Sequence, residues 1–255
     1  MFTILEIVPF HRERSFLKRL FYKTPEPQIE RIALRGGGFF YSVMAYKDKN
    51  NMFAEKEICD AIGNAASRVI LKNSTTLPLD SKMHLFQPEL FPTLLFSNMV
   101  LEYLKETKNE KEDRTLGILD PKGCLSQNVL AYVPYAKSIC ICTKHPERYQ
   151  MAEKEALEEY GLPLTITENV EKCRDASVFL EPLYLKNPEL FGYLHERKGF
   201  ETIYCGENLN LPPEFEERCP TNVDKIFFAA ALYEISNIKN LENLSYANRK
   251  RIKTL

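Results

Sequence analysis

The sequence predicts an α/β fold, in which a mixed α/β domain is followed by a mostly parallel sheet with flanking helices. Between residues 115 and 182, apolar runs that favour strands alternate with segments that favour helices: TLGILD, KSICICTK, LTITEN and SVFLEP are the runs. Such alternation is typical of parallel strands joined by crossover helices. In these sheets ligands bind at the carboxyl ends of the strands, so the pattern also predicts where a site would lie.

The composition indicates a folded protein without a basic excess or a membrane span. Hydrophobic residues make up 44% of the 255 residues, enough for a substantial core. With 34 basic and 35 acidic residues the net charge is −1, whereas a nucleic-acid-binding domain usually has a basic excess. No apolar run approaches the roughly 18 residues that a membrane-spanning helix needs. The start, MFTILEIVPFHRER, has its apolar residues before its basic ones, the reverse of a secretory signal, so we expect a cytoplasmic protein.

The cysteines and histidines predict no metal site. Seven cysteines without a CxxC motif suit a reducing compartment. Cys140 and Cys142 are two residues apart on an expected strand, so both point to one face, where packing is the favoured role. The four histidines form no HExxH motif, and we therefore expect no bound metal.

The N-terminal part, residues 1–110, is predicted to mix strands and helices. TILEIVPF favours a strand, and HRERSFLKRLFYK has the periodicity of a basic amphipathic helix. Strands are expected at QIERIAL and FFYSVMAY, followed by a helix in MFAEKEICDAIGNAASRVI and a short strand at RVILKN. Pro92 fits the first turn of a helix through TLLFSNMVLEYLKE. The charged run TKNEKEDR, near residues 106–114, is interpreted as a linker or an exposed turn.

The second part, residues 111–240, continues beyond the four apolar runs. NPELFGYLHERKG is predicted to be helical and ETIYCG to be a fifth strand. From about Asn222, VDKIFFAAALYEISNI predicts a strong helix. Its apolar stripe is a core face or the face of a homodimer, and it consists of Phe227, Phe228, Leu232 and Ile235. Residues 241–255 are a basic tail, which we expect to be partly disordered.

The loop after TLGIL is where a dinucleotide phosphate would bind. A dinucleotide fingerprint places three glycines there, for the turn, the approach of the pyrophosphate and helix packing. Here only Gly123 remains, and Asp120 stands near the place of the first glycine, where its carboxylate would repel a pyrophosphate. Lys122 offers a compensating ammonium group. The loop is therefore either a weakened phosphate site or an ordinary loop.

The end of the second strand bears on the choice of cofactor. An acidic residue at this position usually holds the ribose of NAD, whereas basic residues favour NADP. This chain has Thr143, Lys144 and Arg148, and the two basic side chains are candidates for a 2′-phosphate. The alternative is a solvated turn that Thr143 caps.

Two carboxylates are the candidate catalytic residues. Asp120 follows the first strand, and Glu181 follows the apolar run VFL directly. At the carboxyl end of a strand, Glu181 would face the crevice and act as a base or bind a ligand hydroxyl. Capping of a neighbouring helix is the alternative role for Glu181.

The order of these segments resembles the shikimate dehydrogenase-like arrangement of NAD(P)-binding proteins. The resemblance spans roughly residues 113–238 and is carried by TLGILDPKGC, SICICTKHPERY, ASVFLEP, ETIYCGENLN and VDKIFFAAALYEI. It implies a Rossmann-like domain after a substrate domain, with a site for NADP. The chain departs from the pattern in its single loop glycine, and its N-terminal part has no serine-rich substrate motif and no catalytic Lys–Asp pair.

Two functions are favoured at this point. A third, a methyltransferase-like use of the same sheet with S-adenosylmethionine, is less favoured, because it needs an acidic residue after the second strand, where Lys144 stands. The first is an NADP-dependent oxidoreductase that acts on a small metabolite, with hydride transfer carried by the cofactor. The second is a non-catalytic binding or scaffold protein that has lost dinucleotide binding. The basic residues after the second strand favour the first function, and the missing glycines favour the second.

Overall fold

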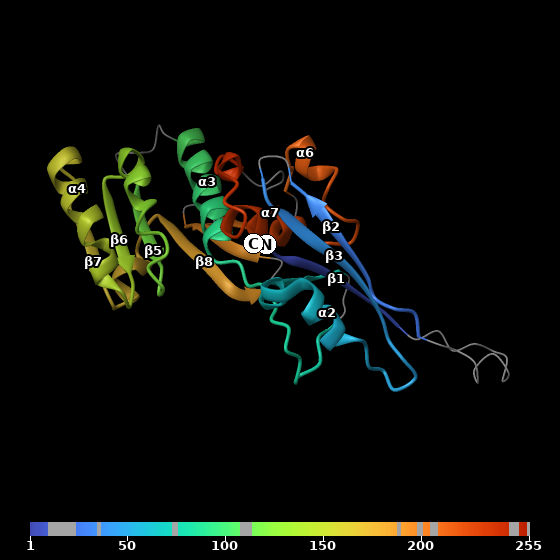
Figure 1. The fold of residues 1–255 in the computed structure, drawn as a ribbon. Helices are drawn as coiled ribbons and strands as arrows, with labels where there is room; N and C mark the ends of the chain where they lie inside the picture. Colours follow the sequence, from blue (N-terminus) through green and yellow to red (C-terminus); the bar gives the residue numbers. More distant parts are fainter. Residues whose placement is uncertain are drawn as a thin grey trace. The chain divides into compact units, whose positions relative to one another are not determined.

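The computed structural model describes residues 1–9, 24–34, 37–72, 76–107, 114–187, 190–197, 201–204, 209–244 and 250–253 (Figure 1). The chain forms two compact units: one is Met1–Pro88 with Leu211–Leu241, and the other is Glu89–Asn210 with Glu242–Leu255. These units differ from the ranges expected from the sequence. The long helix before the charged run belongs to the second unit, and Leu211–Leu241 belong to the first.

The first unit is built on a four-stranded sheet with the order β2-β3-β1-β4. Its strands are β1 (Thr3–Val8), β2 (Gln28–Ala33), β3 (Phe39–Tyr46) and β4 (Val69–Leu71). β1 pairs in parallel with β3 and β4, and β2 runs antiparallel to β3. Its helices are α2 (Glu55–Ile62), η1 (Gly63–Ser67), α6 (Pro213–Glu216), α7 (Lys225–Glu234) and η5 (Lys239–Leu241).

Both faces of this sheet are covered at its central strand β1, whereas the edge strand β2 is largely exposed. Because side chains alternate along a strand, Leu5 and Ile7 of β1 point to one face, where they pack in a cluster with Ile58 and Ile62 of α2. On the other face, α7 covers an aromatic cluster. It consists of Phe2, Phe40 and Phe228, whose ring centroids are 5.2 to 6.1 Å apart.

The first turn of α7 is capped by Asp224, the residue directly before the helix. The Asp224 carboxylate accepts the backbone N–H groups of Ile226 (2.7 Å) and Phe227 (3.2 Å). Such a cap satisfies donors that a helix leaves free at its start. The helix is thereby held where Phe228 closes the aromatic cluster.

The second unit is built on a seven-stranded sheet with the order β11-β10-β9-β8-β5-β6-β7. Its strands are β5 (Thr115–Leu119), β6 (Ser138–Cys142), β7 (Leu164–Thr167), β8 (Val178–Asn187), β9 (Leu190–Glu196), β10 (Glu201–Tyr204) and β11 (Lys250–Lys253). The strands β8, β5, β6 and β7 are parallel, and β9, β10 and β11 extend the sheet in antiparallel pairs.

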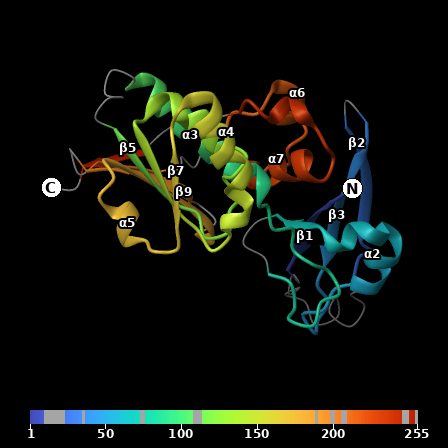
Figure 2. The same cartoon turned by 90° about the vertical axis from the view of Figure 1, so that its left-hand side faces the viewer.

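Helices cover both faces of this sheet (Figure 2). They are α3 (Leu90–Glu106), η3 (Val129–Tyr135), η4 (Pro146–Tyr149), α4 (Gln150–Tyr160) and α5 (Glu171–Arg174). α5 approaches β5 so closely that a Cβ on Gly117 would lie 2.5 Å from the carbonyl oxygen of Cys173. Gly192 of β9 likewise makes room for the Phe96 ring of α3: a Cβ on Gly192 would lie 2.5 Å from the nearest ring carbon.

The predicted fold class is confirmed, as is most of the expected order of elements. The strands within TILEIVPF, QIERIAL, FFYSVMAY and RVILKN are present, and Pro92 lies in the first turn of α3. The four apolar runs between 115 and 182 form or begin β5 to β8. The predicted basic helix over residues 11–23 lies outside the described residues.

Two elements of the second unit differ from the expectation. The segment predicted as a helix over NPELFGYLHERKG contains the strand β9 instead, because its residues pair along β8. The strand predicted to end just before Glu181 continues to Asn187. In addition, residues 250–253 of the basic tail form β11, which pairs with β10.

Within the described ranges, none of the helices has both the length and the apolar character needed to cross a bilayer.

Candidate functional site

The loop after β5 leaves the sheet through a tight turn. The backbone N–H of Asp120 donates to the carbonyl of Cys142 in β6, and that of Gly123 donates to the carbonyl of Asp120, at 2.9 and 3.0 Å. Gly123 has a φ of +66°, a conformation that glycine adopts without strain. A Cβ at this position would also lie 2.7 Å from Cδ of Arg148. The single glycine of the loop therefore serves both the turn and the close packing of Arg148.

Asp120 is fully buried, and its carboxylate accepts three hydrogen bonds. Oδ2 accepts the backbone N–H of Leu125 at 2.8 Å and the hydroxyl of Tyr149 at 2.5 Å. Oδ1 accepts the hydroxyl of Tyr184, a residue of β8. A buried carboxylate is tolerated when donors surround it in this way. The donors that surround Asp120 come from its own loop, from the turn before α4 and from the neighbouring strand.

The tyrosines around Asp120 hold their protons strongly. Burial raises the pKa of Tyr149 and Tyr184, and the negative charge of Asp120 raises both further. Burial also raises the pKa of Tyr132, whose hydroxyl donates to Ser97 at 2.9 Å. All three hydroxyls are therefore donors, and a role as a base is disfavoured for each.

These raised pKa values predict a loss of stability in alkali. The unfolded chain releases tyrosine protons above about pH 10, whereas the folded protein keeps them. The free energy of unfolding should therefore fall by about 1.4 kcal/mol per pH unit for each such tyrosine. Urea unfolding of the wild type and of Tyr149→Phe between about pH 9 and 11 measures this slope. The slope should be shallower in Tyr149→Phe, and equal slopes would contradict the prediction.

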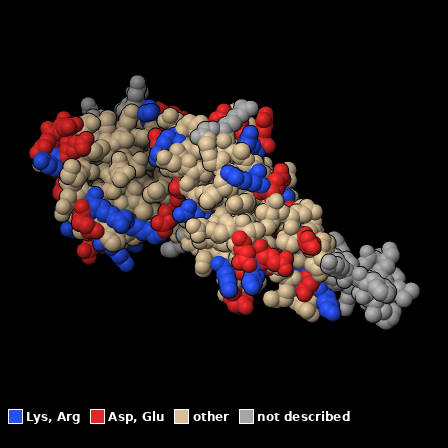
Figure 3. Space-filling view, in the orientation of Figure 1, with Lys and Arg blue, Asp and Glu red and all other residues tan. Residues whose placement is uncertain are grey.

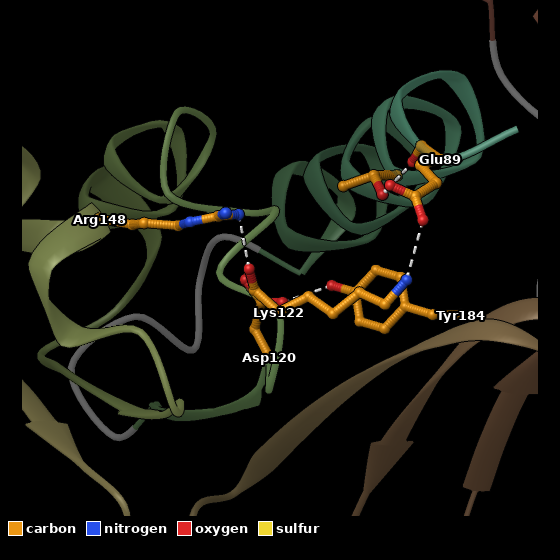
Figure 4. Close-up of polar contacts among 6 residues, drawn as sticks. Glu89, Asp120, Lys122, Arg148 and Tyr184 are labelled. Carbon is orange, nitrogen blue, oxygen red and sulfur yellow. Dashed lines mark hydrogen bonds and ion pairs between the residues drawn. The ribbon is translucent and has the colours of Figure 1, made fainter.

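The two basic residues near Gly123 already have partners (Figure 4). Nζ of Lys122 lies 3.0 Å from Oε1 of Glu89, and its side chain remains 44% exposed. The guanidinium of Arg148 donates to the carbonyl of Lys122 at 2.7 Å. The structure thus brings three of the expected phosphate-binding residues together, namely Lys122, Gly123 and Arg148. Both cations support the loop.

The turn after β6 separates the other two expected cofactor residues. Thr143 is buried, and its hydroxyl oxygen accepts the backbone N–H of His145 at 3.1 Å, so it caps its own turn. Lys144 is exposed and forms no ion pair with another described residue. The charge of Lys144 is therefore available to a ligand.

Glu181 lies within β8 rather than at its end. Its carboxylate accepts the hydroxyl of Tyr193, which stands directly opposite on β9. Among the described residues, no hydrogen bond joins Glu181 to Asp120, Lys122 or Arg148. The two carboxylates predicted as catalytic candidates therefore belong to separate hydrogen-bond networks.

A pocket of about 730 Å³ opens beside the loop. Apolar side chains from three segments contribute to it, and two of them, Leu90 and Met151, are largely exposed. Acidic side chains gather over α4, which forms one wall (Figure 3). The lining residues are Glu89, Leu90, Gly123, Cys124, Ser126, Gln127, Leu130, Arg148, Met151, Ala152 and Glu155.

Two further observations bear on the chemistry of this pocket. Its cysteine, Cys124, is a poor nucleophile, because burial and the charge of Asp120 raise its pKa. In the described part of the chain, no group of three or more His, Cys, Asp or Glu side chains is placed to hold a metal ion. Sequence reasoning missed Glu89, Tyr149 and Tyr184, which are distant from the loop in the sequence and carry no motif.

Comparison of the chain with protein-family models, with curated proteins and with solved structures gives no match.

Proposed function

We propose that the second unit is a non-catalytic ligand-binding module that has the strand order of a dinucleotide-binding fold but does not bind a dinucleotide. The order β7-β6-β5-β8 corresponds to the order 3-2-1-4 of the doubly wound nucleotide-binding sheet. The loop after β5 would then be the phosphate loop. One observation carries the proposal: the buried carboxylate of Asp120 already places a negative charge inside this loop and accepts hydrogen bonds there.

A phosphate loop needs free backbone N–H groups at the start of an α-helix. Here residues 121–128 form turns, and the element that follows is the 3₁₀ segment η3, with Pro134 inside it. The N–H of Leu125 already donates to Asp120. A pyrophosphate at this place would compete with Asp120 for the N–H of Leu125 and would face the negative charge of that carboxylate, so its binding is disfavoured.

The pocket beside the loop is the proposed binding site. Its volume of about 730 Å³ is within the usual range for small-molecule sites, and it combines apolar side chains with a few polar groups. A small molecule with an apolar body fits this lining better than a highly charged dinucleotide does.

An NADP-dependent oxidoreductase remains the second candidate, because Lys144 is exposed without an ion pair among the described residues. Arg148 is four residues further along the chain and retains guanidinium N–H groups beyond the one bonded to Lys122. Together they could hold a 2′-phosphate. This candidate requires the pyrophosphate to bind away from the loop after β5.

Thermal unfolding with millimolar NADP, NADPH, NAD and S-adenosylmethionine separates the two functions. We expect no change in Tm with any of them, whereas a ligand at about 100 times its Kd would add about 2.7 kcal/mol and raise Tm by several degrees. A rise with NADP that is lost in Lys144→Ala/Arg148→Ala would contradict the proposal. The matched control is Lys154→Ala/Arg174→Ala, which removes two exposed cations elsewhere in the second unit.

A further inference from the structure

The first unit contains a second pocket, of about 600 Å³, whose charged lining residues are all basic. Three basic side chains contribute to it: Arg68, Lys82 and His84. The other lining residues are Met1, Gly63, Asn64, Ala65, Ala66 and Ser67. No aspartate or glutamate is among them, whereas the chain as a whole has slightly more acidic than basic residues.

The backbone around this pocket is held by hydrogen bonds. Arg68 donates its N–H to Ala65 at 3.2 Å and accepts the N–H of Thr3 at 3.0 Å. His84 donates to the carbonyl of Ala66 at 2.9 Å and accepts the N–H of Val69 at 2.9 Å. In both residues the backbone N–H and the carbonyl are hydrogen-bonded, to β1, η1 and β4. The backbone from which the two side chains extend is therefore fixed.

The third basic residue is held by a side chain. The backbone N–H of Lys82 donates to Oε1 of Glu55 at 2.6 Å, and the hydroxyl of Ser81 donates to the same oxygen at 2.8 Å. Glu55 contacts this segment through these two bonds and does not line the pocket. The ammonium group of Lys82 and the guanidinium of Arg68 form no ion pair with another described residue.

We propose that this pocket binds the phosphate group of a small phosphorylated metabolite. An arginine guanidinium binds two phosphate oxygens with two parallel N–H donors, and a lysine contributes a mobile positive charge. His84, which lines the same pocket, offers an imidazole N–H as a further donor. The volume leaves room for a body of about the size of a sugar. The inference uses residues of the first unit alone and is independent of the function proposed for the second.

A titration of the isotope-labelled full chain with inorganic phosphate, followed by NMR at constant ionic strength, tests this site. We expect saturable shifts of amide signals from residues 63–68 and 82–84, and no such shifts with sodium chloride. Phosphate binding should weaken about tenfold or more in Arg68→Gln and in Lys82→Gln, since each variant removes a charge-assisted contact. Both side chains are exposed, so the variants should keep the Tm of the wild type.

The matched control is Lys56→Gln, which removes an exposed cation from α2 outside the pocket. It should bind phosphate as the wild type does. The inference is wrong if phosphate produces no saturable shifts, or if the shifts lie outside the pocket. Equal weakening in Lys56→Gln and Arg68→Gln would also overturn it, because phosphate would then respond to net charge rather than to a site.

Discussion

Replacement of Asp120 by alanine should lower the free energy of unfolding by about 3–5 kcal/mol. The carboxylate accepts the hydroxyls of Tyr149 and Tyr184 and the N–H of Leu125. Its removal leaves these donors without their acceptor, and each unsatisfied buried donor costs about 1–3 kcal/mol. Urea unfolding, monitored by circular dichroism, measures the change.

A matched control is Asp175→Ala. The Asp175 side chain is 96% exposed and lies 3.3 Å from Arg197, so its loss should cost less than about 1 kcal/mol. The variant Asp120→Asn keeps the shape but offers only one acceptor oxygen, and it should fall between the wild type and Asp120→Ala. If Asp120→Ala and Asp175→Ala had the same stability, the carboxylate would have no structural role in the loop.

Replacement of Phe228 by alanine should destabilise the first unit by about 3–5 kcal/mol. The ring is fully buried and makes edge contacts with Phe2 and Phe40, at centroid distances of 6.1 and 5.7 Å. Truncation removes both contacts and leaves a cavity that the stacked pair of Phe2 and Phe40 cannot fill without moving. Urea unfolding combined with the NMR signals of β1 and β3 reports on this unit specifically.

The neighbouring residue offers a control on the same helix. Phe227 is only half-buried, so Phe227→Ala removes the same atoms with less loss of packing and should cost clearly less than Phe228→Ala. Equal losses in the two variants would contradict the assignment of α7 to the core of the first unit.

The sequence was sufficient to predict the parallel strands because each is a short apolar run bounded by turn residues. Strands buried on both faces have this character, and β5 and β6 lie inside the sheet. The segment that forms β9 was predicted as a helix because a short run such as LFGYLHE fits either state by its local pattern. Its pairing with β8 decides between them, and that pairing is a contact between chain segments that no local pattern contains.

The candidate site shows the same division between local and distant information. The position of Asp120 after β5 follows from the strand pattern, and so does its place in the loop where a dinucleotide-binding fold would hold phosphate. Its partners Tyr149 and Tyr184 lie 29 and 64 residues away, and neither belongs to a motif. The basic pocket was also missed, because its residues lie before β4 and before the bridge at Leu85, at the amino ends of strands. Sequence rules for parallel sheets direct attention to the opposite ends.

The two-segment construction of the first unit has a consequence for how the protein is made. α7 follows the whole of Glu89–Asn210 in the chain, so a ribosome completes β1 to β4 long before it synthesises the helix that covers Phe2 and Phe40. At about 5–20 residues per second, that interval is of the order of ten seconds or longer. During this time one face of the sheet exposes aromatic rings, and an exposed apolar surface of this kind is prone to aggregation. Strands β5 to β10 of the second unit are synthesised within the same interval, so most of its sheet can form before the first unit is complete.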